Sequence, residues 1–315
     1  MIRKAAPCDR ERVKSLWSYC FYDSEPFLSW WFNRVYSAEN TVIADENGNL
    51  AGALQTVDYG ICVSDKVYNA SYICGVSVWP QYRGNGIGAR MLSFAEEDAR
   101  RRGRDFLILI SDAEGYYEKY GYVSCFERTE YVFHPRDVQR PCAKHIKRAD
   151  ISDAGVLLSL YGAYAEKYDC RIVRTADDMR MAAEQYGLYR GGIYIVYDSC
   201  GKAEGYIAFY IENKTLIADE IVYTSLSGIN SLLGIIYSHG SQVDKAVIKT
   251  STDDPMRYLI YGKTVEMHRI PTVMVKALNG GDPQKVFWHS GGALAELIGA
   301  KTGGGTPKTC FINII

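Results

Sequence analysis

Residues 72–99 read YICGVSVWPQYRGNGIGARMLSFAEEDA, and this stretch decides the fold. It begins as an apolar strand pattern, passes through glycines at 84, 86 and 88, and continues with the apolar spacing of an amphipathic helix. Glycine lets the backbone turn tightly and approach a ligand closely. A helix start offers unpaired N–H groups and a partial positive charge, and Arg83 adds a cation beside them. The stretch therefore predicts a site for a pyrophosphate.

A glycine-rich turn also has other interpretations. One is a turn that merely connects a strand to a helix. A second is a dinucleotide-binding fold, but that fold places Gly-x-Gly-x-x-Gly directly after its first strand, whereas here the spacing is Gly-x-Gly-x-Gly and several strands precede it. A third is a P-loop, which needs Gly-Lys-Ser/Thr, and residues 72–99 lack that run.

The chain repeats itself. Residues 2–17, IRKAAPCDRERVKSLW, are similar to residues 146–161, IKRADISDAGVLLSLY. Further on, DENGNLAGALQ at 45–55 is similar to DSCGKAEGYIA at 198–208, and in both an Asp-x-x-Gly turn between apolar runs predicts a hairpin. Two matches in the same order indicate a duplicated unit of about 140 residues.

Strands and helices alternate in each copy, which predicts an α/β protein, with an α+β mixed sheet that has helices on its faces. We expect one copy at residues 1–140, a second at 141–268 and a short segment at 269–315. The second copy has no Arg-Gly-x-Gly run in its corresponding stretch, residues 216–240, so we expect it to be a degenerate, structural repeat. The final segment is glycine-rich and too short to form a core alone, but its apolar end favours docking onto the repeats.

Composition excludes several classes of protein. Of the 315 residues, 36 are Lys or Arg and 37 are Asp or Glu, so no broad basic field is present to bind nucleic acid. The apolar runs are shorter than the ~18 residues that a membrane helix needs, and residues 1–17 are charged where a signal peptide would be apolar. The nine cysteines and five histidines are scattered, which predicts a reducing compartment and no metal site. We therefore expect a cytoplasmic protein that binds neither nucleic acid nor a membrane.

The run Val-x-Val-x-Pro-x-x-Arg-Gly-x-Gly-Ile-Gly at residues 76–88 resembles the acetyl-CoA-binding motif of the GNAT N-acetyltransferase superfamily. Residues 117–122, YEKYGY, are similar to the Tyr-x-Lys-x-Gly-Phe signature of that family, with Ala113 at the usual alanine position. The two motifs together are specific, although Ile110 stands in place of a frequent asparagine. The resemblance implies tandem GNAT folds, an acetyltransferase activity and acetyl-CoA as cofactor.

The resemblance also implies roles for individual residues. The implied cofactor site consists of Val76, Ser77, Val78, Arg83, Gly84, Asn85, Gly86, Ile87, Gly88, Ala89, Asp112 and Ala113. Within it, the backbone of 76–78 would bind the pantetheine arm and polarise the thioester carbonyl, and residues 83–89 would bind the pyrophosphate. Tyr117 would protonate the departing thiolate or donate a hydrogen bond to it. A phenol of pKa ~10 protonates a thiolate of pKa ~8.5 uphill, which favours the hydrogen bond. The alternative is a structural tyrosine, one of 25 in the chain.

A duplicated GNAT with a short appendage resembles the Eis (enhanced intracellular survival) acetyltransferases over essentially the whole chain. This resemblance implies a reduced sterol-carrier-protein-like segment at 269–315, a hexamer, and a chain-terminal carboxylate, that of Ile315, as catalytic base. An α-carboxylate of pKa ~3.5 is a poor base at neutral pH unless it is desolvated. Orientation of the amine or of a water by Ile315, and an ordinary chain end, therefore both remain open.

Residues 21–36, FYDSEPFLSWWFNRVY, fall where GNAT folds place substrate-facing helices. An acidic, aromatic pocket for an amine could be formed there by Asp23, Glu25, Trp30, Trp31 and Tyr36. The alternative is that the aromatic residues fill a core while the acids face solvent.

The predicted function is transfer of acetyl from acetyl-CoA to a primary amine of a small molecule or peptide, by direct attack in a ternary complex. No catalytic nucleophile is indicated, although Cys74 and Cys125 lie near the motifs. The first alternative is a non-catalytic acyl-CoA-binding or regulatory module, and the second is a nicotinamide dehydrogenase. We expect a homo-oligomer.

Overall fold

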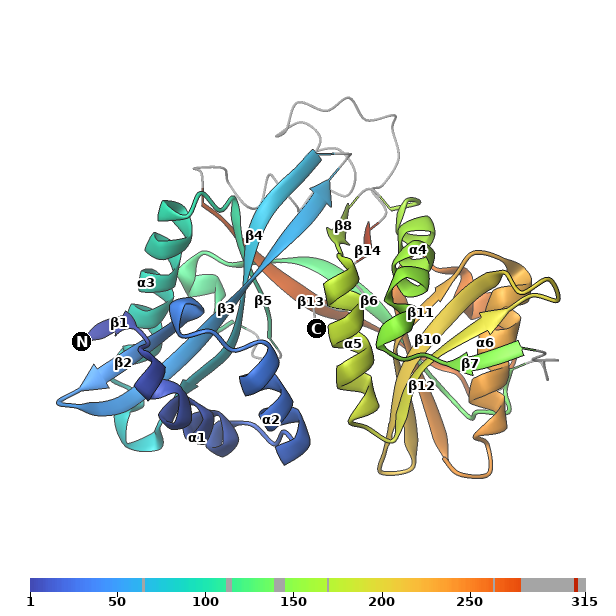
Figure 1. Ribbon diagram of the computed structural model, residues 1–315, viewed down its shortest axis with the longest axis horizontal. Helices are drawn as coiled ribbons and strands as arrows, with labels where there is room; N and C mark the ends of the chain where they lie inside the picture. Colours follow the sequence, from blue (N-terminus) through green and yellow to red (C-terminus); the bar gives the residue numbers. More distant parts are fainter. Residues whose placement is uncertain are drawn as a thin grey trace. The chain divides into compact units, whose positions relative to one another are not determined.

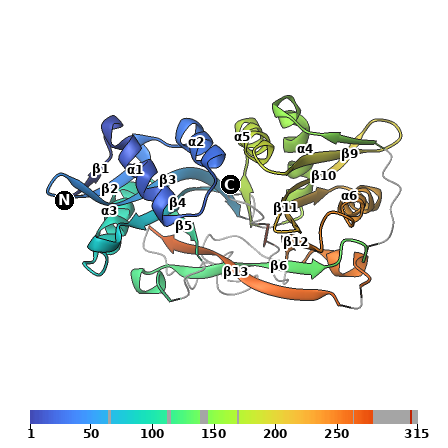
Figure 2. The same ribbon diagram turned by 90° about the horizontal axis from the view of Figure 1, so that it is seen from below.

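Two compact units make up the protein (Figures 1 and 2). The computed structural model describes residues 1–63, 66–111, 115–138, 145–168, 170–262, 264–278 and 309–310. The first unit contains Met1–Cys125 and the segment that starts at Thr272, and the second contains Phe126–Pro271 and the segment that starts at Pro307. Each unit combines a mixed sheet with helices, which confirms the predicted α/β class. The domain boundaries inferred from the sequence stay a prediction.

The first unit is a mixed sheet with three α-helices. Its elements are β1 (Ile2–Lys4), α1 (Arg10–Cys20), α2 (Glu25–Arg34), β2 (Thr41–Glu46), β3 (Asn49–Val63), β4 (Lys66–Val78), α3 (Ile87–Arg101), β5 (Phe106–Ile110) and the second half of β13 (Glu266–Ala277). The strands follow the order β1-β2-β3-β4-β5-β13. All pairs are antiparallel except β4 with β5, which is parallel.

Helices cover both faces of this sheet. The predicted apolar stripe of α3 is buried, with Met91 and Ala95 in one cluster with Leu54 of β3. The next residue of β3, Gln55, instead accepts a hydrogen bond from Trp31 of α2. Because successive side chains of a strand point to opposite faces, α3 and α2 lie on opposite sides of the sheet.

The second unit repeats this plan. Its elements are β6 (Val123–Phe133), β7 (His145–Arg148), α4 (Ala154–Ala165), β8 (Cys170–Val173), α5 (Ala176–Gly187), β9 (Gly191–Tyr197), β10 (Ala203–Glu212), β11 (Thr215–Tyr223), α6 (Leu226–Ser238), β12 (Lys245–Ser251) and β14 (Thr309–Cys310). The strand order β7-β9-β10-β11-β12-β6 again contains one parallel pair, β11 with β12. The hairpin predicted around each Asp-x-x-Gly turn is present, as β2–β3 and as β9–β10.

The start of each unit shows the duplication at the level of single hydrogen bonds. Asp9 accepts the N–H of Ala6 at 2.9 Å, and Asp153 accepts the N–H of Asp150 at 3.0 Å. Each aspartate also forms an ion pair with a basic residue of the strand before it. The matched positions of the two sequences therefore form the same turn ahead of the first helix.

The strand that completes the sheet of each unit follows a strand of the other unit in sequence. β6 follows β5 in sequence, but its residues 128–133 pair antiparallel with β12. β13 follows β12 in sequence, but its residues 273–277 pair antiparallel with β5. The sheet of the first unit is therefore completed by residues that come after the second unit in the chain.

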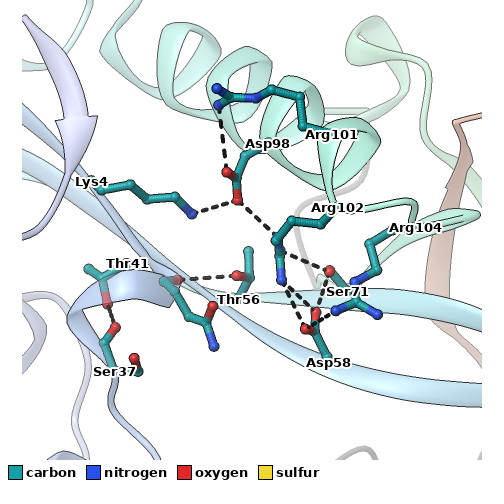
Figure 3. A network of polar contacts seen from close by, with 11 residues as sticks. Lys4, Ser37, Thr41, Thr56, Asp58, Ser71, Asp98, Arg101, Arg102 and Arg104 are labelled. Atoms are coloured by element: carbon teal, nitrogen blue, oxygen red, sulfur yellow. Dashed lines mark hydrogen bonds and ion pairs between the residues drawn. The ribbon is translucent and has the colours of Figure 1, made fainter.

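A polar network joins the C-terminal end of α3 to the sheet (Figure 3). Asp58 of β3 accepts hydrogen bonds from Arg104 at 2.6 Å, Arg102 at 2.9 Å and the Ser71 hydroxyl at 2.5 Å. Asp98 of α3 accepts from Arg102 at 3.1 Å. These contacts fix how α3 lies on the sheet, and therefore where its N-terminal N–H groups point.

Among the helices of the described ranges, none has the length and apolar character needed to cross a membrane.

Candidate active site

Strand β4 leaves its neighbour before it ends. In the part of the chain that the structure describes, the parallel pairing joins residues 70–73 of β4 to residues 106–109 of β5, and β4 then continues to Val78. Before that end, the pairing of β4 with β3 shifts register at a bulge that contains Gly75, whose φ is +60°. Divergence at a bulge turns backbone groups of β4 away from the ladder, where a ligand can reach them.

Gly75 is required by close packing as well as by its backbone angle. A Cβ on Gly75 would collide with the ring of Trp17 on α1. The Trp17 indole is in turn oriented by donating its Nε1–H to Asp23 at 2.8 Å. The bulge in β4 is therefore stabilised by the helix that packs against it.

The start of α3 has the geometry of an anion site. Gly84 and Gly86 have φ of +81° and +68°, and a Cβ on either would meet open space. Gly86 is the N-cap of α3, no side chain among the residues that the structure describes caps the helix, and its first turn contains no acidic residue. The N–H groups of a first helical turn have no partner within the helix, so they remain available here to a negatively charged group.

One cavity of about 610 Å³ lies at this helix start, within the range of ~300–1,000 Å³ typical of small-molecule sites. Its lining includes these residues of the predicted site: Val76, Val78, Arg83, Gly84, Gly86, Ile87, Gly88, Ala89 and Tyr117. The structure thus brings together the end of β4, the glycine loop, the helix start and the motif tyrosine.

Other predicted residues have different positions. The buried hydroxyl of Ser77 lies 3.1 Å from the carbonyl oxygen of Gly75, so its side chain faces the backbone. Asn85 is exposed, with its Nδ2 3.5 Å from the Tyr82 carbonyl oxygen. Three further predictions lie outside the described residues: Asp112, Ala113 and Ile315.

Four residues of the lining were missed by the sequence analysis, namely Tyr82, Tyr116, Lys119 and Tyr120. The ammonium of Lys119 lies 4.4 Å from the ring centre of Tyr116 and 5.1 Å from that of Tyr120, which are cation–π distances. Lys119 and Tyr120 lie inside the quoted motif, so that motif was the signal that could have found them. The cavity lining therefore contains two cationic side chains, Arg83 and Lys119.

Arg83 contacts the end of β4. Its Nε–H donates to the carbonyl oxygen of Val78 at 2.9 Å, and the side chain is exposed. The guanidinium thereby lies next to both β4 and the glycine loop, where it can add positive charge for a phosphate.

Tyr117 is half-buried among other tyrosines. Its ring lies edge-to-face with that of Tyr116 at 4.9 Å and that of Tyr122 at 5.9 Å between centres. Burial, and next the phenols of Tyr116 and Tyr120, raise the pKa of Tyr117 above its ordinary value. The phenol therefore keeps its proton at neutral pH and can serve as a hydrogen-bond donor.

The two cysteines near the motifs are poor nucleophiles. Burial raises the pKa of the Cys74 thiol to about 12. Burial also raises the pKa of Cys125, against a hydrogen bond from the Val275 backbone that lowers it. Since the thiolate is the reactive form, neither side chain is activated for attack on an acyl group.

The two predicted acids near α2 have partners of their own. Asp23 accepts the Trp17 indole N–H at 2.8 Å. Glu25 is exposed and accepts from Lys14 at 2.8 Å, and this hydrogen bond lowers the pKa of its carboxyl. The structure does not bring these two carboxylates into the cavity lining.

The aromatic residues of the same segment lie at different depths. Trp31 is 3% exposed and donates to Gln55 at 3.0 Å. Trp30 lies beside it with 6.4 Å between ring centres, and Tyr36 stacks on Phe32 at 5.0 Å. Burial raises the pKa of the Tyr36 phenol. The amine pocket built from these residues stays a prediction.

Two family models match the chain. One acetyltransferase (GNAT) domain model matches residues 1–125, and a second acetyltransferase (GNAT) domain model matches residues 171–276. No curated protein matches the sequence.

Solved structures share the fold at low sequence identity. A probable N-acyltransferase of unknown function from Enterococcus faecalis is 19% identical, with a TM-score of 0.75 over 88% of this chain and 72% of that chain. A GCN5-related N-acetyltransferase from Anabaena variabilis is 18% identical, with a TM-score of 0.76 over 90% and 74%. Eis1 from Mycobacterium abscessus is 15% identical, with a TM-score of 0.67 over 89% and 74%. The chain therefore carries two GNAT acetyltransferase domains in tandem.

Proposed function

We propose that the first unit transfers an acetyl group from acetyl-CoA to a primary amine. One observation carries this proposal: a single cavity is lined by the diverging end of β4, the uncapped start of α3 and the phenol of Tyr117. These features correspond to the three parts of an acyl-CoA reaction. The end of β4 would bind the extended arm of the cofactor, and the start of α3 would bind its diphosphate. The Tyr117 phenol would stabilise the thiolate as it leaves.

The residues fit the cofactor. The open space at Gly84 and Gly86 is where a Cβ would stand in any other residue, so the loop leaves room for a diphosphate beside the helix N–H groups. Arg83 and Lys119 supply positive charge. Val76 and Val78 offer an apolar wall to the arm of the cofactor.

Acetyl-CoA, when bound, supplies an activated acyl group as a thioester. Backbone N–H groups of residues 76–78 would polarise the carbonyl oxygen, which favours the build-up of negative charge there. The Tyr117 phenol would donate a hydrogen bond to the departing sulfur. Because the pKa of Tyr117 is raised further above that of a thiol, full proton transfer is more uphill, and hydrogen bonding is the larger contribution.

The amine attacks directly in this proposal. Burial keeps Cys74 and Cys125 as protonated thiols, so neither of these two side chains is activated to form a covalent acyl-enzyme. The role of Ile315 as the acceptor of the amine proton stays a prediction, because that residue lies outside the described residues. The Eis-like assignment is also a proposal, supported by the similarity to Eis1 over 89% of this chain.

Thiol release with a panel of amines tests the proposal. We expect the free thiol of coenzyme A to appear only when acetyl-CoA and a primary amine are both present, with small-molecule and peptide amines compared side by side. We also expect acetyl-CoA to raise the melting temperature by preferential binding to the folded state, and NADH not to do so. Binding without thiol release across the panel would contradict catalysis and support a binding module instead.

A further inference from the structure

Lys276 belongs to the strand that completes the first unit. It lies on the part of β13 that pairs with β5, opposite Leu107. Its ammonium donates to the carbonyl oxygen of Tyr120 at 2.7 Å and pairs with Glu96 of α3 at 2.5 Å. The side chain is 20% exposed, so both contacts are partly shielded from water. One lysine thus joins α3 to the turn that carries the motif tyrosine.

The turn held by Lys276 is tight. The N–H groups of Tyr120 and Tyr122 both reach the carbonyl oxygen of Tyr117, at 3.0 and 3.3 Å. Gly121 has a φ of +84°, and a Cβ there would lie 3.4 Å from Cε of Lys276. The stem of the lysine therefore lies along the glycine while its ammonium binds the carbonyl next to it.

Packing connects this turn to the tyrosine ring. Tyr122 is 2% exposed and lies edge-to-face with Tyr117, and the Lys276 ammonium is 5.9 Å from the Tyr122 ring centre. The Tyr122 hydroxyl is buried and has no hydrogen-bond partner in the described ranges of the chain. The position of the Tyr122 ring therefore depends on packing and on the backbone that Lys276 binds.

We infer that Lys276 is a positioning residue, which fixes the turn of residues 117–122 against α3 and so sets where the Tyr117 phenol points. By this inference, a strand that follows the second unit in sequence determines the catalytic geometry of the first. The inference rests on the proposed function, because it concerns the role of Tyr117 in acyl transfer.

A double-mutant cycle tests whether Lys276 acts through Tyr117. We expect Lys276→Met to lower kcat about tenfold and to change KM for acetyl-CoA by less than about threefold. In the Tyr117→Phe background, we expect the same change to lower kcat by less than about twofold, because residues that act through one another are not additive. Equal losses of kcat in both backgrounds would overturn the inference.

Lys249 offers a matched control. It lies on β12 of the second unit, pairs with Asp219 at 2.5 Å and is also 20% exposed. We expect Lys249→Met to leave kcat unchanged in both backgrounds, while it lowers the melting temperature about as much as Lys276→Met does. If Lys276→Met does not fold, Lys276→Arg, which keeps the charge but displaces the donor, is taken through the same cycle with the same criterion.

Hydrogen exchange gives a readout that does not need activity. We expect the amides of Tyr120 and Tyr122 to exchange at least about tenfold faster in Lys276→Met than in the unmodified chain, because the turn opens more often. Unchanged exchange at both amides would overturn the inference whether or not the enzyme turns over. Absence of thiol release from the unmodified chain would instead count against the proposed function.

Discussion

The two units share a fold but differ at the helix that follows the diverging strand. In the first unit, α3 begins after residues 79–86 and its N-cap, Gly86, offers no side chain. In the second unit, only residues 224–225 separate β11 from α6, and the hydroxyl of Ser225 accepts the N–H of Gly228 at 2.9 Å. The same backbone plan therefore leaves N–H groups available in one unit and satisfies one of them internally in the other.

Electrostatics sharpen this difference. The Ser225 hydroxyl donates to the carboxylate of Glu204 at 2.7 Å, so a negative charge already lies beside the start of α6. A second anion would be repelled there, whereas the first turn of α3 contains no acidic residue. We therefore expect the start of α6 to bind no phosphate, in contrast to the start of α3.

Two ionic contacts, one in each unit, differ in how deeply they are buried. In the second unit, Arg174 lies 2.8 Å from Glu220, and the two side chains are 10% and 5% exposed. In the first unit, Arg102 and Asp58 are 25% and 32% exposed (Figure 3). Water screens the Arg102–Asp58 pair far more than the Arg174–Glu220 pair.

The largest expected effect is on the buried pair. We expect Glu220→Gln to lower the free energy of unfolding by about 3–5 kcal/mol, because Arg174 would keep a buried charge without its carboxylate. Asp58→Asn should lower it by at most about 1 kcal/mol, because that pair is partly exposed. Urea unfolding of both variants measures the two values, and equal losses would contradict the distinction.

The second-largest effect is expected on ligand binding at the glycine loop. We expect Gly86→Val to weaken binding of coenzyme A by about 100-fold or more, which corresponds to about 2.7 kcal/mol. The added side chain would occupy the open space at the start of α3. It would also place a β-branched residue at a φ of +68°, where such residues are strained. Gly201→Val, at a φ of +80° in the β9–β10 turn, imposes similar strain without touching the cavity. Titration calorimetry should show weakened binding only for the first variant.

A smaller effect is expected at Tyr117. We expect Tyr117→Phe to lower kcat about 10- to 100-fold with little change in affinity for coenzyme A, since one hydrogen bond to the leaving group is lost. The raised pKa keeps the phenol protonated through the neutral range, and its donor is lost only as pH rises through that pKa, above 10. The ratio of the two kcat values should therefore stay constant between about pH 7 and 9. A ratio that falls across this interval would show that the phenol ionises there.

The smallest effect tests the capped helix. We expect Ser225→Ala to lower the free energy of unfolding by about 1 kcal/mol, as loss of an N-cap does. It should not create a site for coenzyme A in the second unit, because Glu204 and the short connection remain. Calorimetry with Gly86→Val in the same chain isolates the second unit, and any restored binding would contradict our account.

Local chemistry made much of the fold and site predictable. Glycines at 84, 86 and 88 next to an apolar-periodic helix predicted a tight turn ahead of a helix start, and the structure has such a turn before α3, with positive φ at Gly84 and Gly86. The hairpins and the helix of residues 87–101 follow from patterns that repeat within a few residues. Such features depend on neighbours in the chain, so sequence alone carries them.

The sequence by itself determined the duplication, the strand–glycine–helix unit and the position of Tyr117 in its motif. Only the tertiary structure decided which strand completes which sheet, that Lys276 contacts the carbonyl of Tyr120, and that Ser225 caps α6 with Glu204 beside it. The physical reason is distance along the chain: pairing, burial and charge contacts between remote segments depend on packing, which no local pattern records.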